Sequence, residues 1–300
     1  MPVSHPRYDL LHRRLTAFTR RLDGVEKGRI ASVHHARVAS RRLREVLPVL
    51  QLEGAIASHL GRRLRKVTKR LGTVRELDAL LALGDAYQAS AGDDARALSR
   101  VTSALGQERS AARDRLLARL PVAQLRRLAA KLEKVADALR EHETARQTGR
   151  GWRWAIDARV AHRAALLKGA IETAGAVFIP GRVHDVRIAI KKLRYAVEME
   201  DDLSPNKSWS HELATMKRTQ ALLGRLHDRQ VLIDRVRQVQ ASLTPPDLVV
   251  WRGLGSLVTR IENECRRLHA RYVRDAAGLV ALCERVAGRT SGASRARRAG

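Results

Sequence analysis

The sequence is poor in aromatic residues and in cysteine, and each shortage excludes a class of protein. It contains four tryptophans, four tyrosines and two phenylalanines in 300 residues. These are too few for the stacking platforms of proteins that bind single-stranded nucleic acid. The two cysteines, Cys265 and Cys283, give neither a disulfide framework nor the spacing of a metal site. Such cysteine usage is typical of a protein in a reducing cytosol.

Long apolar runs and catalytic motifs are also absent. No segment approaches the roughly 18 consecutive apolar residues of a membrane span, and the first ten residues, MPVSHPRYDL, lack the apolar core of a secretory signal. We therefore expect a cytoplasmic protein without membrane insertion. There is no GxxxxGK[ST] phosphate loop, no G-x-S-x-G elbow and no cysteine with a supporting histidine at a recognisable spacing. We expect no catalytic residues, no metal, no cofactor and hence no enzyme activity.

Acidic residues are scarce relative to basic ones. The chain carries 58 lysines and arginines against 31 acidic residues, a formal net charge of +27. Only four of the arginines lie in the last twelve residues, RTSGASRARRAG, which we predict to be a disordered basic tail over 289–300. The excess charge therefore belongs mainly to the folded body. Such a field attracts polyanions, namely nucleic acid, acidic membrane surfaces or phosphate polymers.

The pattern of the remaining sequence predicts an all-α protein. Ala, Leu, Arg and Glu dominate, and β-branched or aromatic runs with a period of two are absent. Glycines and prolines predict breaks between the helices, among them Gly72, Pro121 and Pro180-Gly181. Long helices are expected at about 93–119 and 247–275.

One basic pattern occurs twice, half a chain length apart. Residues 33–44 read VHHARVASRRLR and residues 183–194 read VHDVRIAIKKLR. In each copy a histidine and three cations follow at i, i+3, i+7 and i+10, which places them on one face of a helix. A single row of this kind is often only a solvated face, but two copies in register indicate a shared polyanionic ligand. The two ladders are His34, Arg37, Arg41, Arg44 and His184, Arg187, Lys191, Arg194.

The opposite face of each copy is apolar, so each segment is an amphipathic helix with one side in a core. The repeat continues beyond it, because LGTVRELDALL at 71–81 resembles LGRLHDRQVLI at 223–233. We expect two homologous helical bundles, each burying its own apolar stripe, with both ladders facing one another. The predicted division is 1–147, 148–288 and the tail 289–300.

The doubled H-x-x-R-x-x-x-[RK]-[RK]-L-R segment, followed each time by L-G-x-x-[RH]-[DE], resembles the CHAD family, the conserved histidine α-helical domain. The similarity covers roughly residues 7 to 287. It implies two four-helix bundles related by a pseudo-two-fold axis, around a basic central channel that binds inorganic polyphosphate. It also implies association with polyphosphate granules.

The resemblance implies a set of polyphosphate-binding residues by motif position. A turn is expected after each L-G pair. His227 departs from the pattern, because the first copy has Arg75 at the corresponding position. The implied set is His34, Arg37, Arg41, Arg42, Arg44, Arg65, Lys69, Arg75, His184, Arg187, Lys191, Lys192, Arg194, Lys217, Arg218 and His227.

Three alternatives remain open from the residues alone. The charge would suit a nucleic-acid-binding protein, although no recognition helix or RNA-binding signature is visible. The dipeptides His184-Asp185 and His227-Asp228 suggest a metal-dependent phosphohydrolase, but the first copy has His35 and Glu76 at the corresponding positions. A basic scaffold for an acidic protein or a phospholipid surface is the third. Nothing in the sequence specifies the oligomeric state.

Overall fold

The computed structural model describes residues 5–88, 95–145, 151–203, 209–243 and 247–296. Within these ranges the chain forms helices and turns without a β-strand, so the all-α prediction is confirmed. None of these helices is both long and apolar enough to cross a membrane. The helices are α1 (Pro6–Thr19), α2 (Leu22–Glu26), α3 (Ile30–Val46), α4 (Gly54–Gln88), α5 (Ala95–Arg119), α6 (Val122–Ala145), α7 (Gly151–Ala174), α8 (Pro180–Leu203), α9 (Ser210–Ala241) and α10 (Leu248–Ala296), with a 3₁₀ turn, η1 (Leu47–Val49), after α3.

Prolines mark several helix boundaries. Pro180 is the first residue of α8, where the missing backbone N–H costs nothing. Pro121 separates α5 from α6, because a proline cannot continue the hydrogen-bond ladder of a helix. The break expected at Gly72 is wrong, since Gly72 lies within the continuous helix α4. A glycine inside a helix costs only about 1 kcal/mol relative to alanine, which packing on neighbouring helices offsets.

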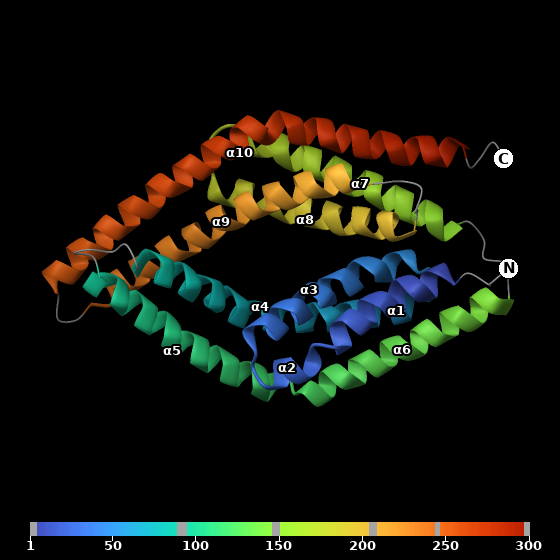
Figure 1. The fold of residues 1–300 in the computed structure, drawn as a ribbon, viewed down its shortest axis with the longest axis horizontal. Helices are drawn as coiled ribbons and strands as arrows, with labels where there is room; N and C mark the ends of the chain where they lie inside the picture. Colours follow the sequence, from blue (N-terminus) through green and yellow to red (C-terminus); the bar gives the residue numbers. More distant parts are fainter. Residues whose placement is uncertain (1–4, 89–94, 146–150, 204–208, 244–246, 297–300) are drawn as a thin grey trace.

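Each half of the chain builds a bundle with the same succession of packing partners. In the second half, α7 packs on α8, α8 on α9, α9 on α10 and α10 back on α7. In the first half, α1 packs on α3, α3 on α4, α4 on α5, and α6 returns to α1. Helices α5 and α6 together therefore take the place of the single long helix α10. In Figure 1 α10 runs along the upper edge of the molecule, and α5 and α6 run along the lower edge.

The two halves meet at both ends of the molecule. At one end α4 and α5 contact α9 and α10, and at the other α1 and α3 contact α8. Buried apolar side chains from both halves form one continuous core, so the expectation of two separately buried stripes is wrong. The predicted domain boundary at 147/148 lies outside the described residues and remains a prediction.

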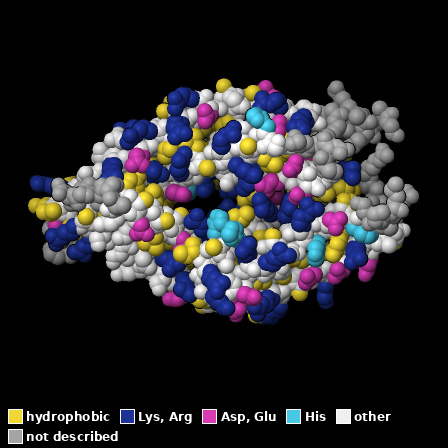
Figure 2. Space-filling model, in the orientation of Figure 1, with side chains coloured by type: hydrophobic (Ala, Val, Ile, Leu, Met, Phe, Trp, Pro, Cys, Tyr) yellow, Lys and Arg dark blue, Asp and Glu magenta, His cyan; other side chains and the backbone are white. Residues whose placement is uncertain are grey.

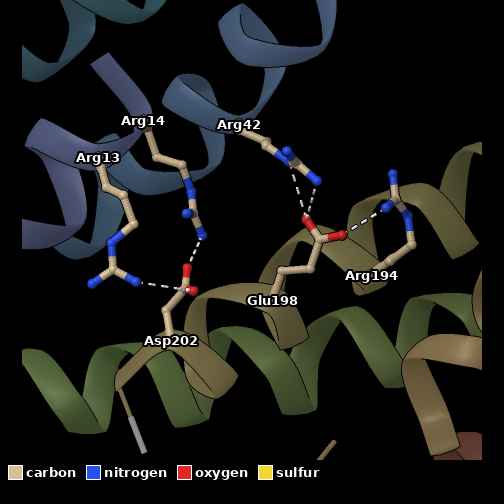
Figure 3. A network of polar contacts seen from close by, with 6 residues as sticks. All are labelled: Arg13, Arg14, Arg42, Arg194, Glu198 and Asp202. Carbon is tan, nitrogen blue, oxygen red and sulfur yellow. Dashed lines mark hydrogen bonds and ion pairs between the residues drawn. The ribbon is translucent and has the colours of Figure 1, made fainter. Parts of the chain in front are cut away.

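Ion pairs hold α8 against the first half (Figure 3). Glu198 on α8 accepts hydrogen bonds from Arg42 on α3, at 3.1 Å from Nε, and from Arg194 on its own helix, at 2.6 Å from Nη1. Four residues further along, Asp202 pairs with Arg13 at 3.2 Å and with Arg14. We name Arg13, Arg14, Arg42, Arg194, Glu198 and Asp202 the interhelical clamp. It fixes the side of α3 that faces α8.

The C-terminal end differs from the sequence-based expectation. The sequence predicts a disordered tail from residue 289, whereas α10 continues through Ala296. Arg289 pairs with Glu212 at 3.3 Å and lies 3.9 Å from the ring centroid of Trp209, and Thr290 is only 1% exposed. These contacts pack this part of α10 against Trp209 and the start of α9. Residues 297–300 of the predicted tail lie outside the described ranges.

The clamp leads to a stability prediction. Replacing Glu198 by Ala removes the carboxylate between Arg42 and Arg194 and leaves Arg194, which is 9% exposed, without its ion-pair partner. We expect the free energy of unfolding to fall by about 1–3 kcal/mol, the usual cost of an unsatisfied buried polar group. Chemical denaturation measures this.

The matched control is Glu284→Ala, which breaks an exposed ion pair with Lys168 at 2.8 Å. Water and salt screen such a pair, so its loss should change stability little. Equal effects of the two substitutions would contradict the role given to the clamp.

Candidate functional site

Helices α3 and α8 bring the two basic ladders together. Each helix buries its apolar side, for example Val33 and Ala36 on α3 and Val183 and Val186 on α8. The polar sides of the two helices therefore face the space between the bundles. There the charges of Arg37, Arg41, Arg187 and Lys191 act on one another. We name these four residues the central cation cluster; two of them come from each half.

Burial and mutual repulsion strongly perturb this cluster. Burial, followed by the charges of Arg41 and Arg187, lowers the pKa of Arg37 to about 10. Burial, followed by the charges of Arg41 and Arg187, also lowers the pKa of Lys191 to about 7. The pKa of Arg41 and that of Arg187 are lowered chiefly by burial as well. A positive charge at any of the four is therefore held at a cost.

The cations of this cluster lack carboxylate partners. None of the four forms an ion pair within the described part of the chain, and the Nε atoms of Arg37 and Arg187 are buried without a hydrogen bond there. Asp228 and Glu76 act on Arg187 from a distance, and the Tyr195 hydroxyl contacts Arg41. Figure 2 shows an opening near the middle of this face, between the two halves, with Lys and Arg side chains beside it.

The histidine of the first ladder is held by an arginine from α4. Arg75 donates from Nε to His34 Nδ1 at 2.9 Å. Burial, then the charge of Arg75, lowers the pKa of His34, so the ring is neutral at pH 7. A neutral imidazole that accepts at Nδ1 carries its proton on Nε2, and this N–H can donate to an anion.

The histidine of the second ladder has an equivalent contact. His184 Nδ1 lies 3.3 Å from His227 Nδ1 on α9. His227 thus occupies the place of Arg75 and touches the ladder histidine, despite its different chemistry. Burial, followed by the charges of Arg187 and His184, lowers the pKa of His227 to about 4. The second half therefore places a neutral ring where the first half has a charge.

Other predicted binding residues divide into two groups. Arg42 and Arg194 are committed to Glu198 in the interhelical clamp, so the structure gives them a positioning role. Arg44 is half-buried and unpaired within the described residues; burial, then the charge of Arg65, lowers its pKa. Arg65 thus lies beside the end of the first ladder. Exposed side chains make up the rest of this group, namely Lys69, Lys192 and Lys217.

Arg218 lies away from the central cluster, although its motif position groups it with the ladder residues. It stands nine residues before His227 on α9, which is half a turn around the helix at about 100° per residue. It lines a groove against α10 on the far side of α9. Lys66, its counterpart on α4, likewise faces α6. Motif alignment placed Arg218 in the set, but the helical register excludes it from the shared face.

Three contributors to the site were missed. A Cβ added at Gly72 would lie 3.2 Å from Arg37 Nε, so the missing side chain makes room for this guanidinium. The L-G pair predicts a turn instead, and its repetition gives no signal for this contact, because a Cβ on Gly224 would meet nothing within 4 Å. Tyr195 is buried between Arg42 and Arg194, whose Cζ atoms lie 5.8 and 4.8 Å from its ring centroid. Tyr195 and Glu198 have no counterparts in the first copy, so the repeat gave no signal for them.

These features define a class of all-helical proteins in which two histidine-bearing basic helices, one from each half, face each other. The chain belongs to the CHAD family, because the model of the CHAD domain matches residues 9–237. The remaining residues, including α10, lie outside that match.

Solved structures share the fold at low sequence identity. One is the crystal structure of the CHAD domain from the plant Ricinus communis, with a TM-score of 0.61 and 21% identity over 94% of this chain and 91% of that one. Another is PptA from Streptomyces chartreusis, with a TM-score of 0.57 and 16% identity over 97% of this chain and 100% of that one. Among curated proteins, none matches the chain at a significant level.

The electrostatics of the cluster predict an unusual lysine. With ¹³C-dimethylated lysines, NMR titration of Lys191 should give a midpoint near 7, well below its ordinary value. Replacing Arg41 by Ala removes the largest neighbouring charge that acts on Lys191 and should move the midpoint upward. A Lys191→Gln variant assigns the resonance. A Lys191 midpoint at the usual value for lysine in the unmodified protein would refute the burial of this charge among like charges. A midpoint that Arg41→Ala leaves unchanged would refute it as well.

The Gly72 contact predicts a difference between two matched substitutions. Gly224→Ala places a Cβ in open space, so it should raise the free energy of unfolding by up to about 1 kcal/mol through helix propensity. Gly72→Ala brings the same propensity gain but pushes against the Arg37 guanidinium. Its net gain should therefore be smaller. Chemical denaturation compares the two, and equal gains would show that Arg37 does not depend on Gly72.

Proposed function

We propose that this protein binds inorganic polyphosphate in the opening between its two halves, without hydrolysing it. One observation carries the proposal. Four buried or half-buried cations, two from each half, converge without forming an ion pair in the described part of the chain. Their neighbours Arg42 and Arg194 have carboxylate partners, whereas these four half-buried side chains form no ion pair with a described residue. A polyanion would supply the missing negative charge.

The chemistry of the cluster suits a chain of phosphates. Such a chain offers only oxygen acceptors and carries about one negative charge per phosphate. Arginine forks match those oxygens bidentately, and Lys191 adds a point charge. The neutral histidines His34 and His184 can each supply an N–H donor at the start of their ladder. Family membership supports the same ligand, and it supports association with polyphosphate granules in the cytoplasm.

Nucleic acid is the competing ligand. The aromatic ring beside the cluster is Tyr195, and its contacts with Arg42 and Arg194 leave it covered rather than open to a base. The halves also contact each other at both ends of the opening, which favours a narrow, flexible chain over a duplex. A phosphohydrolase has less support, since no group of three metal-ligating side chains occurs among the described residues.

The test is a ladder variant in which Arg37, Arg41, Arg187 and Lys191 are all replaced by Ala. Affinity for long-chain polyphosphate should fall by about 100-fold or more, because each hydrogen bond to a charged group contributes about 1.5–3 kcal/mol. The slope of log affinity against log salt should also flatten, by up to about 0.9 per lost contact on the duplex-DNA scale. The helical fold should persist, because the substitutions relieve repulsion. Fluorescence anisotropy and circular dichroism measure these effects.

A surface control removes the same charge elsewhere. It replaces Arg100, Arg115, Arg127 and Arg252, which are exposed and without ion pairs within the described ranges, and it should bind nearly normally. Competition with DNA, RNA and anionic vesicles at equal phosphate should leave polyphosphate preferred. Equal losses of affinity in the ladder variant and the surface control would show that binding depends on net charge and not on the central cation cluster. Steady release of orthophosphate by the purified protein would overturn its non-enzymatic part.

A further inference from the structure

A second basic site lies on the outer surface, between α9 and α10. It is a groove of about 860 Å³, which we name the outer groove. Arg218 places it on the side of α9 opposite His227, and Gln220 on that helix bonds Arg194 of α8 at 2.9 Å. Helix α9 therefore separates the outer groove from the central cation cluster. Its lining residues of interest are His211, Arg218, Arg225, Arg271, Arg274 and Arg285.

The outer groove is strongly and openly positive. Five arginines line it, against one carboxylate, that of Asp275. All five are exposed, and none forms an ion pair with a described residue. Arg218 donates to the Thr215 hydroxyl at 3.0 Å, which holds its guanidinium near the wall. The arginines thus keep most of their donors available for a ligand.

Two helical stripes shape the groove. On α9 the lining residues recur at positions 211, 215, 218, 222 and 225, and on α10 at 271, 274, 278, 281 and 285. Both follow the i+3/i+4 spacing of one helix face. Small residues and the leucines Leu222 and Leu279 lie between the arginine rows, and nothing is within 4 Å of a Cβ built on Gly278. The groove is therefore an elongated channel with cations along both walls.

In the first half, the corresponding face of α4 is also basic. Positions 63, 66 and 70 on α4 correspond to 215, 218 and 222 on α9, and Arg63, Lys66 and Arg70 line a groove of about 220 Å³ against α6. There Arg70 donates to the carbonyl of Arg119, which draws one cation onto the protein itself. Of these three positions, 66 and 218 carry a cation in both halves, whereas Thr215 and Leu222 stand opposite Arg63 and Arg70. The feature common to both halves is therefore one cation that faces the outer helix.

We propose that the outer groove is a second phosphate-chain site, independent of the opening between the halves. The proposal rests on the proposed function only in taking the same ligand chemistry, a linear phosphate polyanion that arginine forks bind bidentately. One wall of the groove, on α10, lies beyond residues 9–237, which the family model covers. This site therefore depends on a part of the chain outside the family match.

Calorimetry with tripolyphosphate tests the proposal, since this short anion reports each site separately. The groove variant replaces Arg218, Arg271 and Arg274 by Ala, and its control replaces Arg100, Arg115 and Arg127. We expect two binding events in the unmodified protein and in the control. The groove variant should lose one event, or weaken it at least tenfold, while the ladder variant loses the other. Bound tripolyphosphate should also protect Arg271 and Arg274 from phenylglyoxal.

The outcomes separate the two proposals. Unchanged binding and no protection of Arg271 and Arg274 in the groove would overturn the second site, whatever the ladder variant does. Loss of one event in the groove variant with no loss in the ladder variant would support the outer groove and refute binding at the central cluster.

Discussion

The apolar packing of α3 and α8 forces like charges together, and the rest of the site depends on this constraint. Each helix buries one side in its bundle, and the clamp then sets the two polar sides against one another. Arg37 and Arg187 cannot move apart, because burial of the apolar sides of α3 and α8 fixes the positions of both helices. Repulsion within the central cation cluster therefore lowers the stability of the fold, and burial of the continuous apolar core offsets this loss.

The carboxylates near the site are distributed so that they preserve this repulsion. Glu198 and Asp202 lie toward the end of α8 and neutralise the arginines of the clamp. Asp228 and Glu76 act on Arg187 without pairing with it, and burial raises the pKa of Asp228 although the charges of Arg187, Arg75 and Arg229 oppose the rise. Positive charge is therefore balanced where it holds helices together and left unbalanced where a ligand would bind.

Much of this architecture follows from the sequence. The all-helical fold and the CHAD family were predictable because a twelve-residue pattern occurs twice with its apolar face intact. The continuity of the helix through Gly72 could not be predicted, because local helix propensity contains no information on the tertiary contact between Gly72 and Arg37. Nor could the sequence distinguish Arg194 from Arg187, since only the fold reveals which cation meets Glu198. Motif position also does not reveal that helical register turns Arg218 toward α10 rather than toward the central cation cluster.

The two halves use different chemistry at equivalent positions, and this makes their charges unequal. Arg41 corresponds to Lys191 and Arg75 to His227, so the first half has arginines where the second has groups that titrate. With a pKa of about 7, Lys191 is only partly charged at neutral pH, and His227, at about 4, is neutral. The proposed polyanion would favour the protonated form of both, so its binding would raise their pKa values and take up protons. For Lys191 the linkage has a definite sign: below pH 7 its charge is already present, and above pH 7 the ligand must recharge it, so affinity declines as pH rises. Toward such a ligand the first half would present a fixed charge, and the second half a charge that the ligand itself would help to create.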